Sequence, residues 1–342
     1  MSMAAEKTPI GSKKPKNVSK MKIVCLGGGN LVPKVLLGPL KKYPVRLTGI
    51  TSMVDNGGAV NVFRKQFNVL PPSDIRRHVL ALSNASKWKK DLWTFRFGNE
   101  SYGAWHKGQN FANAFIAGLE FNLKSHSKAM AIVSEFMELG DNRALPMIIE
   151  KTNIFAEMEN GQIIEGECEI ELAQNHNANL KIKKLFQKPE SKMFSEAKKA
   201  VLEADLIIIG PGDLYSSTIP CFLPKDAPAI IKKAKGKKIL ISNSISRKGE
   251  TQGFSIGSFA AEVEKYMGSP LDFVLYHNKP INADLMAKYA KEEAMVCEPL
   301  KIDSDLPKDK FIGADILKKG EFAYDPQKVI SNIFKIIGKK IA

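Results

Sequence analysis

The sequence predicts an α/β fold that is doubly wound and Rossmann-like, with a mostly parallel sheet and an antiparallel β insertion. Short apolar runs such as KIVCLG and ADLIIIG are typical of strands buried in a parallel sheet. Segments with helical periodicity alternate with these runs. A glycine-rich turn, GGGN at residues 27–30, joins the first apolar run to the first helical segment, as in folds that hold a phosphate.

Strands and helices are expected to alternate through the first part of the chain. After the strand KIVCLG comes a helix, VPKVLLGPLKKY, which tolerates Pro33 in its first turn. The second strand is RLTGITSMV, and the helix SDIRRHVLALSN follows it with Ser73 as the expected N-cap. Two further helices are predicted for QNFANAFIAGLEFNL and SKAMAIVSEFMELG, and Gly140 suits the C-cap of the second.

The middle of the chain departs from this alternation. Two strand-like runs in NIFAEMENGQIIEGECEIEL surround Asn160-Gly161, which is a strong hairpin signal, and KIKKLFQ is a candidate third strand. We therefore expect an antiparallel insertion at about residues 146–190 within one domain that spans residues 21–342. The alternation resumes with the strands ADLIIIG, KKILISNS and LDFVLYHN and ends in the helix SNIFKIIGKKI.

Composition indicates a globular protein of the cytoplasm. The chain has 342 residues, 44% of them hydrophobic, and no apolar run approaches the roughly 20 residues that span a bilayer. The four cysteines are far apart and form no CxxC pair, so we expect reduced thiols. The five histidines show no metal-ligand spacing. No metal site and no required cofactor are predicted from these patterns.

The formal net charge of +15 favours an anionic partner such as a phosphorylated ligand. Residues 1–20 carry five Lys against one Glu, and we interpret them as a disordered basic tail. The remaining lysines are scattered, so nucleic-acid binding is not the expected function. It remains an alternative, through the tail and the aromatic segment KWKKDLWTFRFGNESYGAW, although these aromatic side chains fit a core edge or an interface better.

Ligands of doubly wound folds bind beyond the carboxyl ends of the strands, so the residues there are the site candidates. The first strand end presents Gly27, Gly28, Gly29 and Asn30 as a phosphate cradle, although these residues also suit a plain tight turn. The second presents Asp55, Asn56, Gly57 and Gly58, which could bind ribose hydroxyls or a cation, or form only a turn.

Three later segments add candidates. Asp74 and Arg76 lie in the first turn of an expected helix. The aspartate could simply stabilise the start of the helix, and the arginine could bind a phosphate. The second glycine-rich turn, GPGDLYSS, also follows a strand and could also bind a phosphate. It contributes the candidates Gly210, Gly212, Asp213, Tyr215 and Ser216. Asn243 follows another strand and suits a base or sugar edge, with an ordinary polar loop as the alternative.

The motifs GGGNLVPKVLLGPLK, LPPSDIRR, GPGDLYSS and KGETQGFS, in this order, resemble the YvcK-like gluconeogenesis factors, which are related to the CofD-type 2-phospho-L-lactate transferases. The resemblance covers roughly residues 22–278. It implies a homodimer that binds UDP-N-acetylglucosamine and acts in carbon flux, cell shape and wall synthesis. It also places Asn110, Asn113 and Thr251 in ligand loops. For the CofD branch it implies transfer of a phospholactyl-type group from a guanosine diphosphate adduct to a deazaflavin, with Mg²⁺ and Asp55 as a metal ligand.

The sequence departs from the family pattern in four ligand loops. GGGTG is replaced by GGGNL, the paired acids become Asp55-Asn56, GHxxGN becomes QNFAN, and GETDG becomes GETQG with Gln252. The lost acids disfavour metal-dependent catalysis. We therefore predict a regulatory protein that binds a nucleotide sugar, with the transferase as the alternative.

Overall fold

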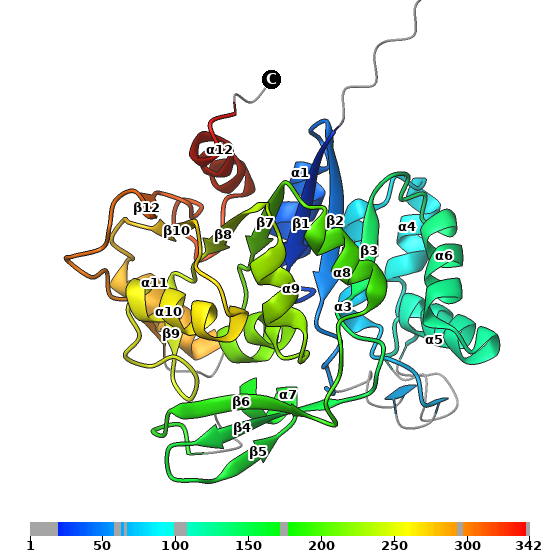
Figure 1. The fold of residues 1–342 in the computed structure, drawn as a ribbon, viewed down its shortest axis with the longest axis horizontal. Helices are drawn as coiled ribbons and strands as arrows, with labels where there is room; N and C mark the ends of the chain where they lie inside the picture. Colours follow the sequence, from blue (N-terminus) through cyan, green and yellow to red (C-terminus); the bar gives the residue numbers. More distant parts are fainter. Residues whose placement is uncertain are drawn as a thin grey trace, which may run out of the picture.

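The computed structural model describes residues 20–57, 63–64, 67–98, 108–171, 177–292 and 297–339. Its centre is a seven-stranded, all-parallel sheet with the order β12-β10-β8-β7-β1-β2-β3 (Figure 1). The strands are β1 (Met21–Leu26), β2 (Val45–Thr51), β3 (Arg143–Pro146), β7 (Leu206–Ile209), β8 (Lys237–Ile241), β10 (Phe273–His277) and β12 (Phe311–Ala314). The chain runs outward in both directions from β1 and β7, which confirms the doubly wound α/β prediction.

Helices cover both faces of this sheet. One group comprises the short helical segment η1 (Val32–Leu37), α1 (Gly38–Leu40), α3 (Ser73–Leu82) and α12 (Pro326–Ile336). The other comprises α8 (Ser195–Leu202), α9 (Ala227–Lys233) and α10 (Ile256–Met267), together with the short segments η3 (Leu214–Thr218) and η4 (Ile219–Phe222). A third cluster, beside β3, contains α4 (Lys87–Thr94), α5 (Phe111–Leu123) and α6 (His126–Phe136) (Figure 1).

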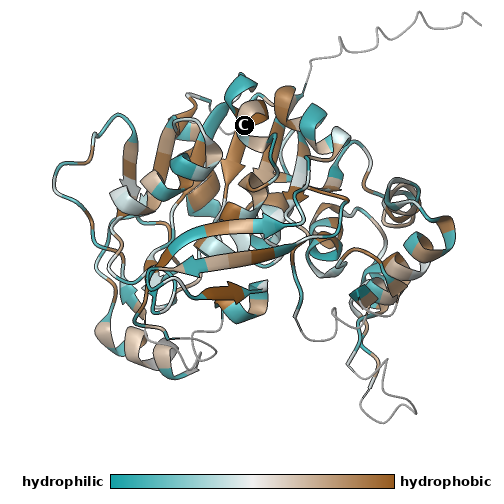
Figure 2. Ribbon diagram, turned by 60° about the horizontal axis from the view of Figure 1, so that its bottom comes forward, coloured by the Kyte–Doolittle hydropathy of each residue, from teal (hydrophilic) through white to brown (hydrophobic). Residues whose placement is uncertain are grey.

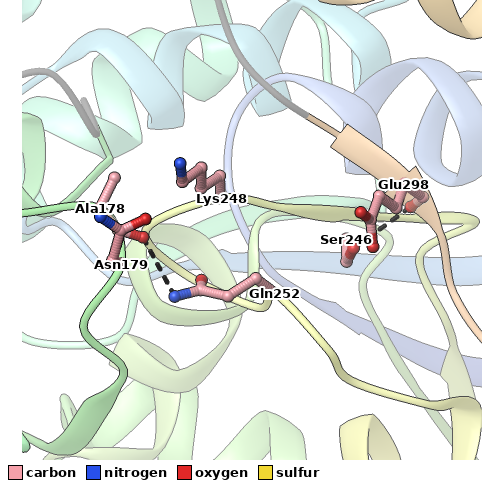
Figure 3. A pocket seen from close by; sticks show the side chains of 6 residues that line it. All are labelled: Ala178, Asn179, Ser246, Lys248, Gln252 and Glu298. Atoms are coloured by element: carbon pink, nitrogen blue, oxygen red, sulfur yellow. Dashed lines mark hydrogen bonds between the residues drawn. The ribbon is translucent and has the colours of Figure 1, made fainter.

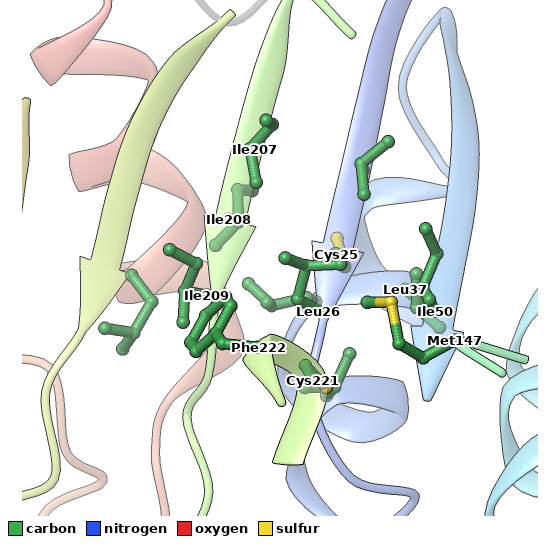
Figure 4. Close-up of a cluster of buried hydrophobic side chains, with 14 of the residues drawn as sticks. Cys25, Leu26, Leu37, Ile50, Met147, Ile207, Ile208, Ile209, Cys221 and Phe222 are labelled. Carbon is green, nitrogen blue, oxygen red and sulfur yellow. The ribbon is translucent and has the colours of Figure 1, made fainter. Parts of the chain in front are cut away.

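The core lies on both faces of the central strands. Leu206, Ile207, Ile208 and Ile209 of β7 are all buried, because helices cover both sides of this strand (Figure 4). Figure 2 shows the central strands largely in brown, the colour of hydrophobic residues. The continuous apolar runs in the sequence therefore mark strands of a parallel sheet, as predicted.

The predicted insertion forms a separate antiparallel sheet with the order β5-β4-β6. Its strands are β4 (Asn153–Met158), β5 (Ile163–Glu165) and β6 (Ile182–Lys188), and β4 and β5 form the predicted hairpin. Gly161 in its turn has a φ of +86°, which glycine adopts without strain. This sheet lies near the carboxyl ends of the central strands (Figure 1). The segment after β5 was expected to be extended, but it forms the short helix α7 (Glu167–Glu171).

Two predicted helix caps are wrong. Ser73 is the first residue of α3 rather than its N-cap, and its hydroxyl donates to the Asp55 carboxylate. Helix α6 ends at Phe136 with Met137 as C-cap, so Gly140, at φ +60°, belongs to the following turn. The Ser73 hydroxyl thus contacts a side chain outside the helix instead of capping its first turn.

The remaining elements lie in the last third of the chain. Two short strands, β9 (Ile245–Arg247) and β11 (Cys297–Pro299), pair antiparallel, and α11 (Ala283–Glu292) precedes β11. Every helix in the described part of the chain is too short or too polar to span a bilayer. All four cysteines are free thiols, as expected. The predicted tail falls almost entirely on residues 1–19, which are outside the described residues.

Candidate functional site

The two glycine-rich turns meet at the carboxyl edge of the sheet. Strands β1 and β7 pair in parallel with Leu26 opposite Ile209, so the turns that follow them are neighbours. A Cβ atom at Gly28 would lie 2.8 Å from the Ser217 hydroxyl oxygen, which shows how closely the turns pack. The absence of a side chain at Gly28 therefore permits this contact.

A cavity of about 390 Å³ opens between these two turns. Five predicted site residues line it, namely Gly28, Asn30, Gly212, Asp213 and Asn243. The wall is completed by Pro211 and Ser217 of the second glycine-rich turn, by Arg247, and by Leu31, Glu171, Ser244, Ile245, Phe322, Ala323 and Tyr324. The cavity thus combines the ends of three neighbouring strands with an acid from α7 and a segment near the end of the chain.

Arg247 provides the positive charge in this cavity. Its guanidinium lies 2.7 Å from Asp213 Oδ2 and 3.7 Å from Glu171 Oε1, and only 12% of its side chain is exposed. Glu171 comes from the insertion, so its presence in the wall depends on tertiary packing that local sequence does not reveal. An anionic group of a ligand could pair with the Arg247 guanidinium, while Asp213 and Glu171 could accept hydrogen bonds from ligand hydroxyl groups.

Asn243 has an unused acceptor in the cavity wall. Its Oδ1 atom is buried and has no hydrogen-bond partner among the described residues. A buried amide oxygen without a partner costs about 1–3 kcal/mol. A ligand N–H or O–H that donates to this oxygen would recover that cost, which makes Asn243 the strongest pointer to a bound molecule.

Several carboxyl groups in and near the cavity wall have raised pKa values. Burial, followed by the nearby Asp55, raises the pKa of Glu167 to about 9. Burial and then Asp213 raise the pKa of Glu250 to about 8, and the same two causes raise that of Glu171. Burial also raises the pKa of Asp74. Glu167 and Glu250 therefore hold protons at a pH at which exposed acids are ionised.

Replacing Glu250 with glutamine is expected to flatten the pH dependence of stability. The folded chain keeps a proton on Glu250 up to about pH 8, whereas the unfolded chain loses it near 4.5. The free energy of unfolding therefore falls as pH rises through this window, by up to about 1.4 kcal/mol per pH unit for one proton. Urea titrations at several pH values between about 5 and 8.5 measure the slope.

In Glu250→Gln the free energy of unfolding should fall less steeply with pH, by most of the contribution of one proton. The variant should therefore be more stable than the parent above about pH 8. The exposed Glu150→Gln is the matched control and should keep the parental slope. Equal slopes for the parent and Glu250→Gln would contradict the assignment.

The DNGG turn lies outside the wall of the cavity and joins the core to the insertion. The Asp55 carboxylate accepts from the Gly57 N–H at 2.8 Å and from the Ser73 hydroxyl. Asn56 Oδ1 accepts from the Cys168 N–H at 3.1 Å, at the start of α7. The structure thus gives Asn56 a structural contact where the resemblance implies a ligand contact. Gly58 lies outside the described residues.

Asp74 supports the first glycine-rich turn. It accepts hydrogen bonds from the Gly29 N–H and from the Thr51 hydroxyl, the latter at 3.2 Å. A neighbouring histidine was overlooked as a site residue: His78 is fully buried, and its Nε2 lies 3.3 Å from the Gly28 carbonyl oxygen. Burial lowers the pKa of His78 to about 4, so this imidazole is neutral and positions the turn.

The KGETQG loop is also fastened to the insertion. Gln252 Nε2 donates to the carbonyls of Ala178 and Leu180 at 3.1 and 3.2 Å, and its Oε1 accepts from the Gly249 N–H at 2.9 Å. Figure 3 shows the Gln252 amide reaching toward Ala178. The Thr251 hydroxyl accepts from the Arg247 N–H at 3.0 Å. Gln252 and Asn56, two of the departures from the family motifs, thus both anchor the insertion.

Replacing Gln252 with glutamate is expected to lower the free energy of unfolding by about 1–3 kcal/mol at neutral pH. The carboxylate would lose the two amide donors and would face two carbonyl oxygens. The loss should shrink below about pH 4, where a protonated glutamate can donate again. Urea denaturation at both pH values measures this, with the exposed Glu150→Gln as control. A loss that is independent of pH would contradict the account.

The other predicted residues lie elsewhere. Tyr215 is buried, and its hydroxyl donates to Glu262 at 3.0 Å. It does not line the cavity between the two turns. Ser216 and Asn113 are buried as well. Gly210, at φ +70°, shapes the second glycine-rich turn, as Gly27, at φ +144°, shapes the first.

Four predicted residues line a second cavity, of about 550 Å³, namely Gly29, Asn30, Arg76 and Asn110. Asn30 lines both cavities. Asn110 is the N-cap of α5, accepting from the Ala112 N–H at 3.0 Å and donating to the Phe95 carbonyl at 3.2 Å. The predicted residues therefore divide between two neighbouring cavities.

The acids do not form a ready site for Mg²⁺. The described residues contain no group of three or more His, Cys, Asp or Glu side chains placed to hold a metal ion. The carboxylates of Asp55 and Asp74 accept internal hydrogen bonds, and Asp213 pairs with Arg247. We therefore derive no step through a metal ion from this arrangement.

Comparison with known proteins identifies the family. The model for the family described as 2-phospho-L-lactate transferase CofD matches residues 23–316. The chain belongs to the CofD family. Its relatives include the gluconeogenesis factor of Halalkalibacterium halodurans, which is 32% identical over 288 residues, 84% of this chain and 85% of that protein.

Other members of the CofD family agree with this assignment. A relative from Clostridium acetobutylicum is 32% identical over 287 residues, and the match covers 83% of this chain but 61% of that longer protein. A crystal structure of a Bacillus halodurans protein superimposes with a TM-score of 0.83 at 29% identity, covering 92% of this chain and 100% of that chain. The predicted family and fold class are therefore both confirmed.

Proposed function

We propose that this CofD-family chain is a cytoplasmic regulatory protein that binds a nucleotide sugar resembling UDP-N-acetylglucosamine. Two relatives bear the name gluconeogenesis factor, which supports a role in carbon metabolism. We extend the proposal to cell shape and wall synthesis, where such nucleotide sugars are consumed. We also propose that the chain acts as a homodimer, which light scattering of the purified protein would test.

The unsatisfied Asn243 oxygen is the observation that carries this proposal. It lies in the wall of a cavity built from two glycine-rich turns, where backbone N–H groups can approach a diphosphate. In our proposal Gly28 and Gly212 contact the diphosphate, with Arg247 nearby. Asn243 accepts from the base or the sugar, and Asp213 and Glu171 accept from hydroxyl groups. Binding of this kind requires no chemical step.

Thermal unfolding with candidate ligands tests the proposal. A ligand at about 100 times its Kd should stabilise the protein by roughly 2.7 kcal/mol. We expect this stabilisation with UDP-N-acetylglucosamine, with and without Mg²⁺, and a smaller one with GDP or NAD. An Asn243→Leu variant should reduce it, because leucine cannot accept a hydrogen bond. The absence of any shift with UDP-sugars would overturn the proposal.

A CofD-type transferase is the second candidate. Asp213 and Glu171 line the same cavity, so acids do lie close to the proposed phosphate position. In this alternative the chain would transfer a phospholactyl-type group from a guanosine diphosphate adduct to a deazaflavin. Stabilisation by GDP that requires Mg²⁺, together with release of guanosine monophosphate during turnover, would favour this candidate over the regulator.

A further inference from the structure

The second cavity is unusually rich in arginine. Arg76, Arg77 and Arg96 all line it, together with Lys34. Its remaining wall combines the polar groups of Gly29, Asn30, Thr94 and Asn110 with the apolar groups of Pro33, Gly38, Leu80 and Ala81. Cationic groups thus converge on a space large enough for a small organic molecule.

Arg76 is buried and forms no ion pair with another described residue. Its exposed fraction is 7%, and its Nε atom is buried with no hydrogen-bond acceptor among the described residues. Within that part of the chain no carboxylate forms an ion pair with Arg76. Buried arginines are normally paired, since desolvation of a lone charge costs free energy.

The fold holds the backbone of Arg76 in place. The Arg76 N–H donates to the Pro72 carbonyl, and the Trp93 indole N–H donates to the Arg76 carbonyl at 2.9 Å. Arg76 therefore has a fixed backbone on α3, next to the first glycine-rich turn. The residue therefore reaches the cavity from a helix of the main fold.

The surrounding charges leave the cavity positive. Burial, followed by the neighbouring Arg77 and Arg96, lowers the pKa of Arg76 to about 10. Asp74 offsets part of this charge through a 3.9 Å contact with Arg77 Nη1. Arg96 donates to the Gly108 carbonyl, which is neutral. Among the described residues, Asp74 and Asp55 are the acids that act on Arg76, whereas three guanidinium groups and Lys34 line the cavity.

We propose that this cavity binds a small organic anion through Arg76, Arg77 and Arg96, at a site separate from the nucleotide cavity. The planar guanidinium fork matches both phosphate and carboxylate oxygens and binds them in pairs. Pro33, Leu80 and Ala81 offer an apolar surface to the organic part of such a ligand. A phosphate ester and a polycarboxylate share this chemistry, and the proposal does not depend on the identity of the nucleotide.

Calorimetric titration of the full chain with inorganic phosphate and, separately, with citrate tests this proposal. At constant ionic strength we expect saturable binding of at least one of the two, and the stronger one identifies the class of anion. Arg77→Gln and Arg96→Gln should each weaken it by about tenfold or more, which corresponds to about 1.4 kcal/mol. Both positions are more exposed than Arg76, so these variants should fold.

The matched control is Arg46→Gln, which removes the same charge from an exposed residue in β2, near the opposite end of the strands. It should bind both probes as the parent does. Equal weakening by Arg46→Gln and Arg96→Gln would indicate only a general charge effect and would overturn the proposal. The proposal would also be overturned if the parent protein bound neither phosphate nor citrate saturably.

One further variant separates this site from the nucleotide site. Gly212→Asp alters the first cavity alone, because Gly212 does not line the second. It should leave phosphate or citrate binding unchanged, while Arg96→Gln should leave UDP-N-acetylglucosamine binding unchanged. Loss of anion binding in Gly212→Asp would place the anion in the first cavity and contradict a separate site, whatever the outcome for the nucleotide.

Discussion

Replacing Gly29 with alanine should lower the free energy of unfolding by about 3 kcal/mol, the upper part of the range for overpacked cores. An added Cβ would lie 2.6 Å from the Asp74 Cα atom, a distance that real Cβ atoms do not show. Asp74 belongs to the first turn of α3, so relief requires either the helix or the glycine-rich turn to shift. Urea denaturation of the unliganded protein measures the loss.

Gly118→Ala provides the control for this experiment. Gly118 lies within α5, and an added Cβ would have no heavy atom within 4 Å. Alanine should stabilise this exposed helical position by up to about 1 kcal/mol. Equal stability of Gly29→Ala and the parent would mean that the turn and α3 do not pack as described.

Replacing Gly212 with aspartate should weaken binding of UDP-N-acetylglucosamine by about 100-fold or more, which corresponds to roughly 2.7 kcal/mol. The new carboxylate would lie next to Asp213, in the cavity where we propose the diphosphate, and would repel it. The added Cβ would lie 3.4 Å from Ser217 Cβ, which is an ordinary contact, so the fold should survive. Gly28 is a poorer choice, because its Cβ would approach the Ser217 hydroxyl too closely.

Isothermal titration calorimetry of the variant measures this loss, and its thermal unfolding without ligand verifies the fold. Gly118→Asp introduces the same carboxylate on an exposed helix face and should bind the nucleotide sugar normally. Parental affinity in Gly212→Asp would place the nucleotide outside this cavity.

The sequence predicted the scaffold well, because patterns local to each segment determine it. Continuous apolar runs identified the central strands, and Asn160-Gly161 identified the hairpin of the insertion. The predicted caps at Ser73 and Gly140 were both wrong. The hydrogen bond from Ser73 to Asp55 is a tertiary contact that propensity does not report. Helix α6 ends with Met137 as C-cap, before Gly140, the position that glycine preference alone would favour.

The candidate site was predicted in part. Both glycine-rich turns and Asn243 were recognised, since each directly follows a strand and the strands are neighbours in the sheet. Glu171 was missed because only the docking of α7 brings it to the cavity. Asn56 and Gln252 were placed in ligand loops, yet their hydrogen bonds fasten the insertion. Residue type and spacing therefore predicted the edge of the sheet at which the cavity lies, but not which side chains line it.

The wall of the first cavity has a consequence for how relatives can differ. The family model ends at residue 316, whereas Phe322, Ala323 and Tyr324 line the cavity. These residues belong to a small hairpin in which Leu317 bridges Tyr324, and the Tyr324 hydroxyl donates to the Ser242 carbonyl at 3.0 Å. The hairpin lies outside the seven parallel strands, so its residues can change while the two glycine-rich turns keep theirs. We therefore expect substitutions at Phe322 or Ala323 to change the shape of the cavity wall and to leave the turns unaltered.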